Sequence, residues 1–102
     1  MIYLKVHITP EGEIIAMCDS ELLGKAYAEG KTELNLSRYA EFYKGDLVTE
    51  EEAGSTHAIN EFYTANIVGT RSVGIFIEKG IAAKEDLKRV GGVPYLHLFR
   101  IV

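Results

Sequence analysis

Hydrophobic and polar positions alternate at the start of the chain. Apolar residues occupy every second position of the first eight, namely Ile2, Leu4, Val6 and Ile8. A period of two places such residues on one face of a β-strand. Segment 9–12 consists of residues that favour turns, and the run 13–18 after it is again apolar and suited to a β-strand. The pattern therefore predicts a β-hairpin.

A helical period replaces the alternation after residue 18. Asp19 or Ser20 is suited to cap a helix from about Glu21 to Glu29, whose apolar residues share one face. Gly30 then stops this helix in a left-handed turn. The segment from Glu33 to Leu36 predicts a short third strand, because its two leucines alternate with polar residues.

Two further helices are predicted in the second half of the chain. Thr49 and Glu52 have the spacing of a capping box, which opens a helix of about four turns. Gly69 is placed to end that helix, and Thr70 to cap a shorter one from Arg71 to Lys79.

Two strands are predicted at the end of the chain. Leu87 to Val90 is the weaker one and Tyr95 to Ile101 the stronger, with the turn 91–94 between them. Pro94 suits the beginning or the edge of a strand, where the N–H that proline lacks is not needed for a hydrogen bond to a neighbouring strand. The elements do not alternate strictly between strand and helix. We therefore expect an α+β fold, a single globular domain over residues 1–102, with a mixed or antiparallel sheet of about five strands and about three helices.

The composition is that of a globular protein, with 47% hydrophobic and 25% charged residues. No signal-peptide pattern and no apolar run of membrane-spanning length is present, so we expect a cytoplasmic protein without membrane attachment. The single cysteine cannot form an internal disulfide, and the three histidines do not stand at zinc-binding spacing. We expect neither a metal nor a cofactor.

Charge is distributed unevenly along the chain. The net charge is −4, but residues 1–70 carry −7 and residues 71–102 carry +3. The later basic residues either converge into one patch or are ordinary solvated charges. No helix is basic enough to read a DNA groove. A sheet platform for nucleic acid would have only a few suitable residues, namely Lys5, Tyr3, Tyr95 and Phe99.

Cys18 is the candidate nucleophile. It lies at the end of a predicted strand beside a predicted helix N-terminus, where the helix dipole would stabilise a thiolate. His7 or His97 would supply the base if the strand order permits. Alternatively, Cys18 packs in the core as a small hydrophobic residue, and the neighbouring Asp19 opposes thiolate formation.

Polar residues at two predicted helix starts are candidate binding residues. Those around the last helix are Asn66, Gly69, Thr70 and Arg71. Free N–H groups there attract anions, and Arg71 needs a negative partner, which is either a protein carboxylate or a bound phosphate. Asp19 and Lys25 flank the first helix, where they either bind a substrate or act as an N-cap and a solvated charge. Glu50 to Glu52 favour a helix start and, as consecutive helix positions, cannot converge on one cation.

Several segments together resemble a known family. They are Lys5-Val6-His7, Cys18-Asp19 through Gly24-Lys25, Glu29-Gly30, Phe42-Tyr43 with Gly45, Glu50 to Ala53, Ala65 to Gly69, Arg71, and Gly92-Val93-Pro94. In combination they resemble the archaeal domain-of-unknown-function family number four hundred and twenty-four. The resemblance implies a small archaeal cytoplasmic protein of uncharacterised activity, loosely associated with translation-related genes.

We therefore expect a non-catalytic interaction or accessory module, associated with translation or RNA. Its partner would be a protein or a ribonucleoprotein assembly. The aromatic segment 39–43 either forms part of a surface that binds a partner or covers the hydrophobic core. The alternative function is a small enzyme that uses Cys18 as nucleophile with a histidine base.

Overall fold

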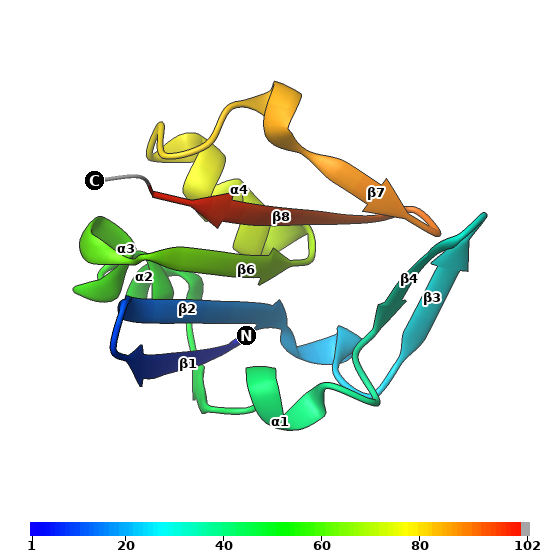
Figure 1. The fold of residues 1–102 in the computed structure, drawn as a ribbon, viewed down its shortest axis with the longest axis horizontal. Helices are drawn as coiled ribbons and strands as arrows, with labels where there is room; N and C mark the ends of the chain where they lie inside the picture. The colour runs from blue at the N-terminus through cyan, green and yellow to red at the C-terminus, as the bar shows by residue number, and fades with distance from the viewer. Residues whose placement is uncertain (101–102) are drawn as a thin grey trace.

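A mixed six-stranded sheet forms the centre of the structure, a computed structural model that describes residues 1–100 (Figure 1). The strand order is β5-β1-β2-β6-β8-β7, in which β2 and β6 are parallel and all other neighbours antiparallel. The strands are β1 (Ile2–Thr9), β2 (Gly12–Asp19), β5 (Asp46–Val48), β6 (Thr64–Val68), β7 (Lys88–Val90) and β8 (Val93–Phe99). The predicted α+β class with a mixed sheet is confirmed.

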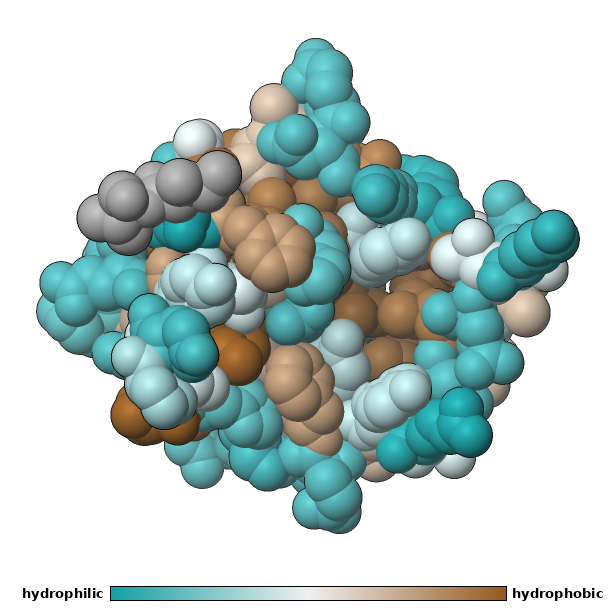
Figure 2. All heavy atoms as spheres, in the orientation of Figure 1, coloured by the Kyte–Doolittle hydropathy of each residue, from teal (hydrophilic) through white to brown (hydrophobic). Residues whose placement is uncertain are grey.

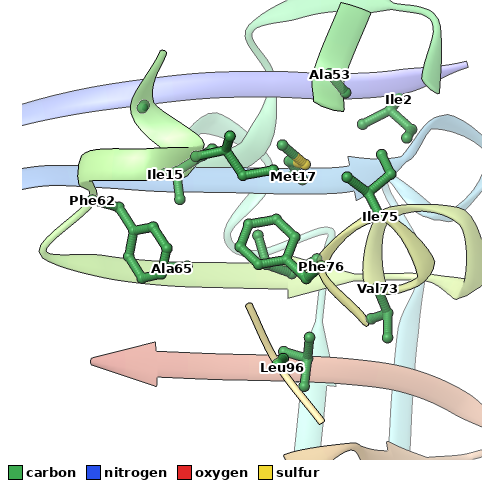
Figure 3. Packing of buried hydrophobic residues seen from close by; sticks show 14 residues of the cluster. Ile2, Ile15, Met17, Ala53, Phe62, Ala65, Val73, Ile75, Phe76 and Leu96 are labelled. Carbon is green, nitrogen blue, oxygen red and sulfur yellow. The ribbon is translucent and has the colours of Figure 1, made fainter. Parts of the chain in front are cut away.

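Three helices cover one face of this sheet and lie behind it in Figure 1. They are α2 (Glu50–Gly54), α3 (Ala58–Glu61) and α4 (Thr70–Glu78). The main core fills the space between them and the strands. Phe76 of α4 is fully buried and lies over the strands that carry Met17 and Ala65 (Figure 3). Phe62 packs beside it, with ring centroids 6.0 Å apart.

A second, smaller layer covers part of the opposite face. It consists of α1 (Ala40–Tyr43) and a separate hairpin of β3 (Ala26–Glu29) and β4 (Thr32–Asn35). A second buried cluster joins this layer to the sheet, and its members are Ala16, Cys18, Leu36, Tyr43, Val68 and Val93. The hairpin also reaches the turn before β8, where Gly91 N donates to Glu29 Oε1 at 3.1 Å.

The helix predicted over 21–29 is wrong, because the chain forms a 3-10 turn, η1 (Ser20–Leu22), and then β3. Gly24 has a φ of +91°, which interrupts a right-handed helix at its middle. Backbone bonds between Gly24 and Leu36, and between Lys25 and Leu36, draw this segment to β4. Gly30, with a φ of +61°, stands first in the two-residue turn that joins β3 to β4.

The four-turn helix predicted after Thr49 is also wrong in its length. The capping box of Thr49 and Glu52 is confirmed, but α2 ends at Gly54 and the chain reaches β6 at Thr64. The segment 64–68 is a central strand because sheet neighbours lie on both of its sides and favour its β-branched residues.

The other predicted elements agree with the structure. The first hairpin is confirmed, and the helix predicted over 71–79 is α4, displaced by one residue, so that Gly69 and not Thr70 is its N-cap. The last two predicted strands correspond to β7 and β8, and residue 101, where the prediction ended the chain's last strand, lies outside the described residues. The strands β3, β5 and β6 and the short helix α1 are additional to the prediction.

Candidate functional site

Two rows of side chains cross the sheet on the face that carries α1 and the hairpin. The strand register aligns Lys5, Ala16, Asn66 and His97 in one row. It aligns His7, Ile14, Thr64 and Phe99 in the other. We call these eight positions the open face, because α1 and the hairpin leave part of them accessible. They contain a lysine and two histidines but no carboxylate.

A groove opens beside the open face, between β6 on one side and β4 and α1 on the other. Its walls are mainly apolar or aromatic, and it is lined by Glu33, Leu34, Asn35, Leu36, Tyr39, Phe42, Tyr43 and Asn66. Its volume is about 360 Å³. Figure 2 shows this face of the molecule, with hydrophobic side chains at the bottom of a hollow between the sheet and the hairpin.

Ring side chains are accessible at the rim of this groove and farther along the open face. Tyr39 is 56% exposed at its rim, and Phe99 is 62% exposed on β8. His97 packs against Phe99 with ring centroids 4.6 Å apart. His7 stacks on Phe42, also at 4.6 Å, and its Nε2–H donates to the Phe42 carbonyl oxygen at 2.8 Å. The His7 ring is therefore held in place, whereas the ring of Tyr39 is accessible to a partner.

Asn66 lies at the edge of the groove, in the middle of β6. Sequence reasoning placed it near the end of a helix that stops at Gly69, but it lies on the central strand β6. Its backbone is paired with the strands on both sides. Within residues 1–100, no protein atom forms a hydrogen bond with its side-chain amide. This polar group is half-buried and available to a ligand.

A second polar cluster lies where the parallel strands β2 and β6 both end, and we call it the Asp19 corner. Asp19 is buried, and its carboxylate accepts hydrogen bonds from the first turn of α4. The Arg71 N–H donates at 3.0 Å, the Ser72 N–H at 2.9 Å and the Ser72 Oγ–H at 2.7 Å. Asp19 therefore caps α4 from a neighbouring strand, not the helix that the sequence predicted at residue 21.

Arg71 meets protein carboxylates in this corner. Its Nη2 contacts Glu21 Oε1, and its Nε lies 3.7 Å from Glu50 Oε1. The pKa of Glu21 is held below its usual value, because the Glu21 carboxylate accepts a hydrogen bond from the Glu21 backbone N–H and lies beside the Arg71 charge. Of the two negative partners that the sequence left open for Arg71, the structure therefore contains the protein carboxylate. Thr70 is exposed at the first position of α4.

Gly69 makes the close approach of α4 and β2 possible. Its φ is +106°, and a Cβ at this position would lie 2.5 Å from Asp19 Oδ2 and 2.7 Å from Asp19 Cβ. Both conditions exclude other residue types without rearrangement.

Lys25 lies elsewhere, exposed at the foot of the hairpin, where its backbone N–H donates to Leu22 O at 3.1 Å. The structure thus joins Asp19, Gly69 and Arg71 in one corner but leaves Lys25 and Asn66 outside it.

Cys18 is fully buried, and burial with the neighbouring Asp19 and Glu21 charges raises its pKa to about 12. Its Sγ–H donates to the Asp19 carbonyl oxygen at 3.3 Å. His7 does not face it, because Cys18 pairs with Tyr3, four residues from His7 along β1. Four strand residues span about 13 Å. His97 is two strands away and pairs with Asn66. The structure therefore places neither proposed base beside this thiol.

The chain matches, over residues 6–101, the family described as protein of unknown function, DUF424. The chain belongs to the DUF424 family. A crystal structure of an uncharacterized conserved protein from Methanopyrus kandleri is similar, with a TM-score of 0.82 and 24% sequence identity. The alignment covers 96% of this chain and 90% of that chain, and at this identity it shows a shared fold. No curated protein matches the chain significantly.

Some of the residues that carry the DUF424 resemblance lie in these two places. Asp19, Gly69 and Arg71 meet in the Asp19 corner, where folding explains each of them. Lys5, His7 and Asn66 lie on the open face. His7 supports Phe42, and Lys5 Nζ donates to Glu41 O at 2.7 Å, but no contact within residues 1–100 accounts for the Asn66 amide.

Sequence reasoning missed the groove of this DUF424 chain. The segment 39–43 was recognised as either a partner surface or a cover of the core, and in the structure Tyr43 is buried in the core while Tyr39 is exposed. The assignment of 64–68 to a helix concealed the position of Asn66 on the sheet. The β-branched residues on both sides of Asn66 could have indicated a strand.

None of the described helices is long and apolar enough to cross a membrane. In the described part of the chain, no three His, Cys, Asp or Glu side chains gather closely enough to hold a metal ion.

Proposed function

We propose that this chain is a non-catalytic binding module of the cytoplasm that serves an RNA-associated assembly, and that the open face is its contact surface. One observation carries the proposal. The open face presents rings, a lysine and an amide without a carboxylate among its eight strand positions, although residues 1–70 carry a net charge of −7. Single-stranded nucleic acid is bound by such a combination of ring surfaces and positive charge.

The charge pattern favours RNA over an acidic protein segment because the accessible groups include rings on which bases stack. Phe99 and Tyr39 are the most exposed of them. Lys88 adds a further cation, since it is exposed on β7 and pairs with Tyr95, on the same side of the sheet. Two carboxylates border the region, Glu33 in the groove lining and Glu41 on α1. The RNA backbone would therefore follow the strands and avoid the hairpin.

The enzyme alternative has no comparable support. A nucleophilic cysteine needs a thiolate and an adjacent base. The Cys18 thiol is buried with its pKa raised to about 12, and both histidines lie along other parts of the sheet.

RNA binding by the purified protein tests the proposal. We expect fluorescence anisotropy to show binding of single-stranded RNA that weakens as salt rises from about 50 to about 200 mM, because binding releases counterions. Lys5→Glu should weaken this binding. Lys79→Glu is the matched control, since Lys79 follows α4 on the helix side of the sheet. The absence of RNA binding at low salt, or equal effects of the two variants, would contradict the proposal.

Capture from a native lysate provides a second test. The tagged chain should recover RNA or ribonucleoprotein components that nuclease treatment removes. Recovery of a protein partner that is indifferent to both nuclease and salt would contradict an RNA-associated role.

A further inference from the structure

The groove has the properties of a site for one flat, partly polar ring. Its volume of about 360 Å³ lies within the usual range of about 300–1,000 Å³ for small-ligand pockets. Leucine side chains and aromatic rings form most of its lining, and Tyr39 remains 56% exposed at the rim. A planar ring could therefore bury one side against the lining and place a face on Tyr39.

The Asn66 amide supplies the polar part of this site. It offers two N–H donors and a carbonyl acceptor, and it is the one lining amide that lacks a side-chain hydrogen bond within residues 1–100. The other lining amide, that of Asn35, already accepts bonds from Ser37 N and Arg38 N at 3.1 and 2.8 Å. A ligand that presents a donor beside an acceptor would satisfy Asn66 with two bonds.

Adenine suits this amide best, because it presents a donor beside an acceptor on both its Watson–Crick and its Hoogsteen edge, whereas uracil, cytosine and guanine do so on the Watson–Crick edge alone. Asparagine pairs bidentately with adenine, because the exocyclic amino group donates while a ring nitrogen accepts. Unpaired bases of RNA are commonly recognised in this way, with their faces stacked on aromatic side chains and their edges hydrogen-bonded. We propose that the groove holds one unpaired adenine of a single-stranded RNA, stacked on Tyr39 and recognised at its edge by Asn66.

The charges around the groove orient such an RNA. Glu33 lies on the β4 wall, so phosphates are disfavoured there. Lys5 and His97 share the cross-strand row of Asn66, which places a lysine and a histidine on the sheet side. The sugar-phosphate backbone therefore passes over the strands while the base enters the groove. This inference rests on the proposed RNA-binding function.

Base discrimination is the property to measure. Fluorescence anisotropy with oligoadenylate and oligouridylate of equal length should show tighter binding of the adenylate. Asn66→Ala should lower the affinity for oligoadenylate about tenfold and leave oligouridylate nearly unchanged, which is the size expected for one bidentate base contact. Asn60→Ala is the matched control, because Asn60 is exposed on α3 at the helix side of the sheet. It should change neither affinity.

Tyr39→Ala provides an independent variant at an exposed position. It should weaken the binding of both oligonucleotides about tenfold, since stacking is tolerant of base identity. Far-ultraviolet circular dichroism would confirm that each variant is folded.

Three outcomes would overturn the inference. If the native chain binds RNA but Asn66→Ala does not change base preference, the adenine site is wrong while the proposed function survives. If the native chain binds no RNA, both fail. If free adenosine monophosphate binds as tightly as the oligonucleotide, the ligand is a mononucleotide and not an RNA strand.

Discussion

The Asp19 corner and the open face differ in how their polar groups are satisfied. In the corner, the buried carboxylate of Asp19 accepts three bonds and Arg71 meets two carboxylates. On the open face, the Asn66 side-chain amide has no hydrogen-bond partner within residues 1–100, and the rings of Phe99 and of Tyr39 at the groove rim are exposed. Arg71 Nε is buried without a hydrogen bond, but the buried carboxylate of Asp19 is fully paired, and such groups stabilise and specify a fold. We therefore assign folding to the corner and binding to the open face.

Asp19→Asn is expected to cause the largest loss of stability. The neutral amide replaces charge-assisted bonds and brings N–H donors toward the N–H groups of α4, which should cost about 3 kcal/mol of unfolding free energy. Urea denaturation measures this value. Asp46→Asn, at an exposed position of β5, is the control and should have little effect. A loss below about 1 kcal/mol would indicate that the corner does not stabilise the fold.

Gly69→Ala is expected to cost about 2 kcal/mol, because the positive φ and the contact with Asp19 both oppose a Cβ. Gly74→Ala in α4 is the opposite case, since a Cβ added there would meet nothing within 4 Å and alanine favours helices. It should raise stability by up to about 1 kcal/mol. Equal effects of the two variants in thermal unfolding would refute the role given to Gly69.

Stability should fall at alkaline pH because of Cys18. Its pKa is raised from 9.0 to about 12, so the folded state favours the neutral thiol. This preference adds to the free energy of unfolding below pH 9, and the added stability is lost as pH rises toward 12. Tyr43, whose pKa burial raises from 10.0 to about 12, adds to this loss. Cys18→Ala should reduce the decline in urea unfolding measured between these pH values, and an unchanged decline would contradict the prediction.

Reactivity of Cys18 distinguishes its two interpretations. At neutral pH, iodoacetamide should alkylate the folded protein more slowly than an exposed thiol and react readily after unfolding in urea. Mass spectrometry follows both reactions. Rapid alkylation of the folded chain would support the enzyme alternative.

Arg71→Gln is expected to cost at most about 1 kcal/mol, because its partner Glu21 is a largely exposed carboxylate. The loss should diminish in high salt, where exposed ion pairs are screened. The same variant should leave RNA affinity unchanged. Weakened RNA binding would instead support the anion site predicted from the sequence around Gly69, Thr70 and Arg71.

Phe99→Ser should have the smallest effect on stability, within about 0.5 kcal/mol, because the side chain is 62% exposed. It should nevertheless weaken RNA binding. A variant that unfolds readily would show that this ring supports the fold instead of a ligand.

Local signals in the sequence predicted much of the fold. The first hairpin and the Thr49–Glu52 capping box follow from alternation and from a three-residue spacing. The segments 21–29 and 64–68 were misassigned to helices because their apolar spacing also suits a helix. Their strand state depends on pairing partners, the adjacent strand β4 for the first and the distant strands β2 and β8 for the second.

The candidate site was predictable only in part. Asp19, Gly69 and Arg71 were recognised as notable residues, but the cap that joins Asp19 to α4 spans 52 positions of sequence and depends on the parallel pairing of β2 with β6. The groove likewise requires that the β3–β4 hairpin and α1 stand on one face of the sheet. No local pattern indicates this arrangement.

A chemical-shift titration tests most directly whether the open face, and not the Asp19 corner, binds RNA. Uniformly ¹⁵N-labelled protein would be titrated with oligoadenylate while backbone and side-chain amide signals are followed. We predict that the Asn66 side-chain amide and the backbone signals of Tyr39, His97 and Phe99 shift, while those of Gly69, Arg71 and Ser72 remain in place. Shifts confined to the corner residues would contradict this assignment.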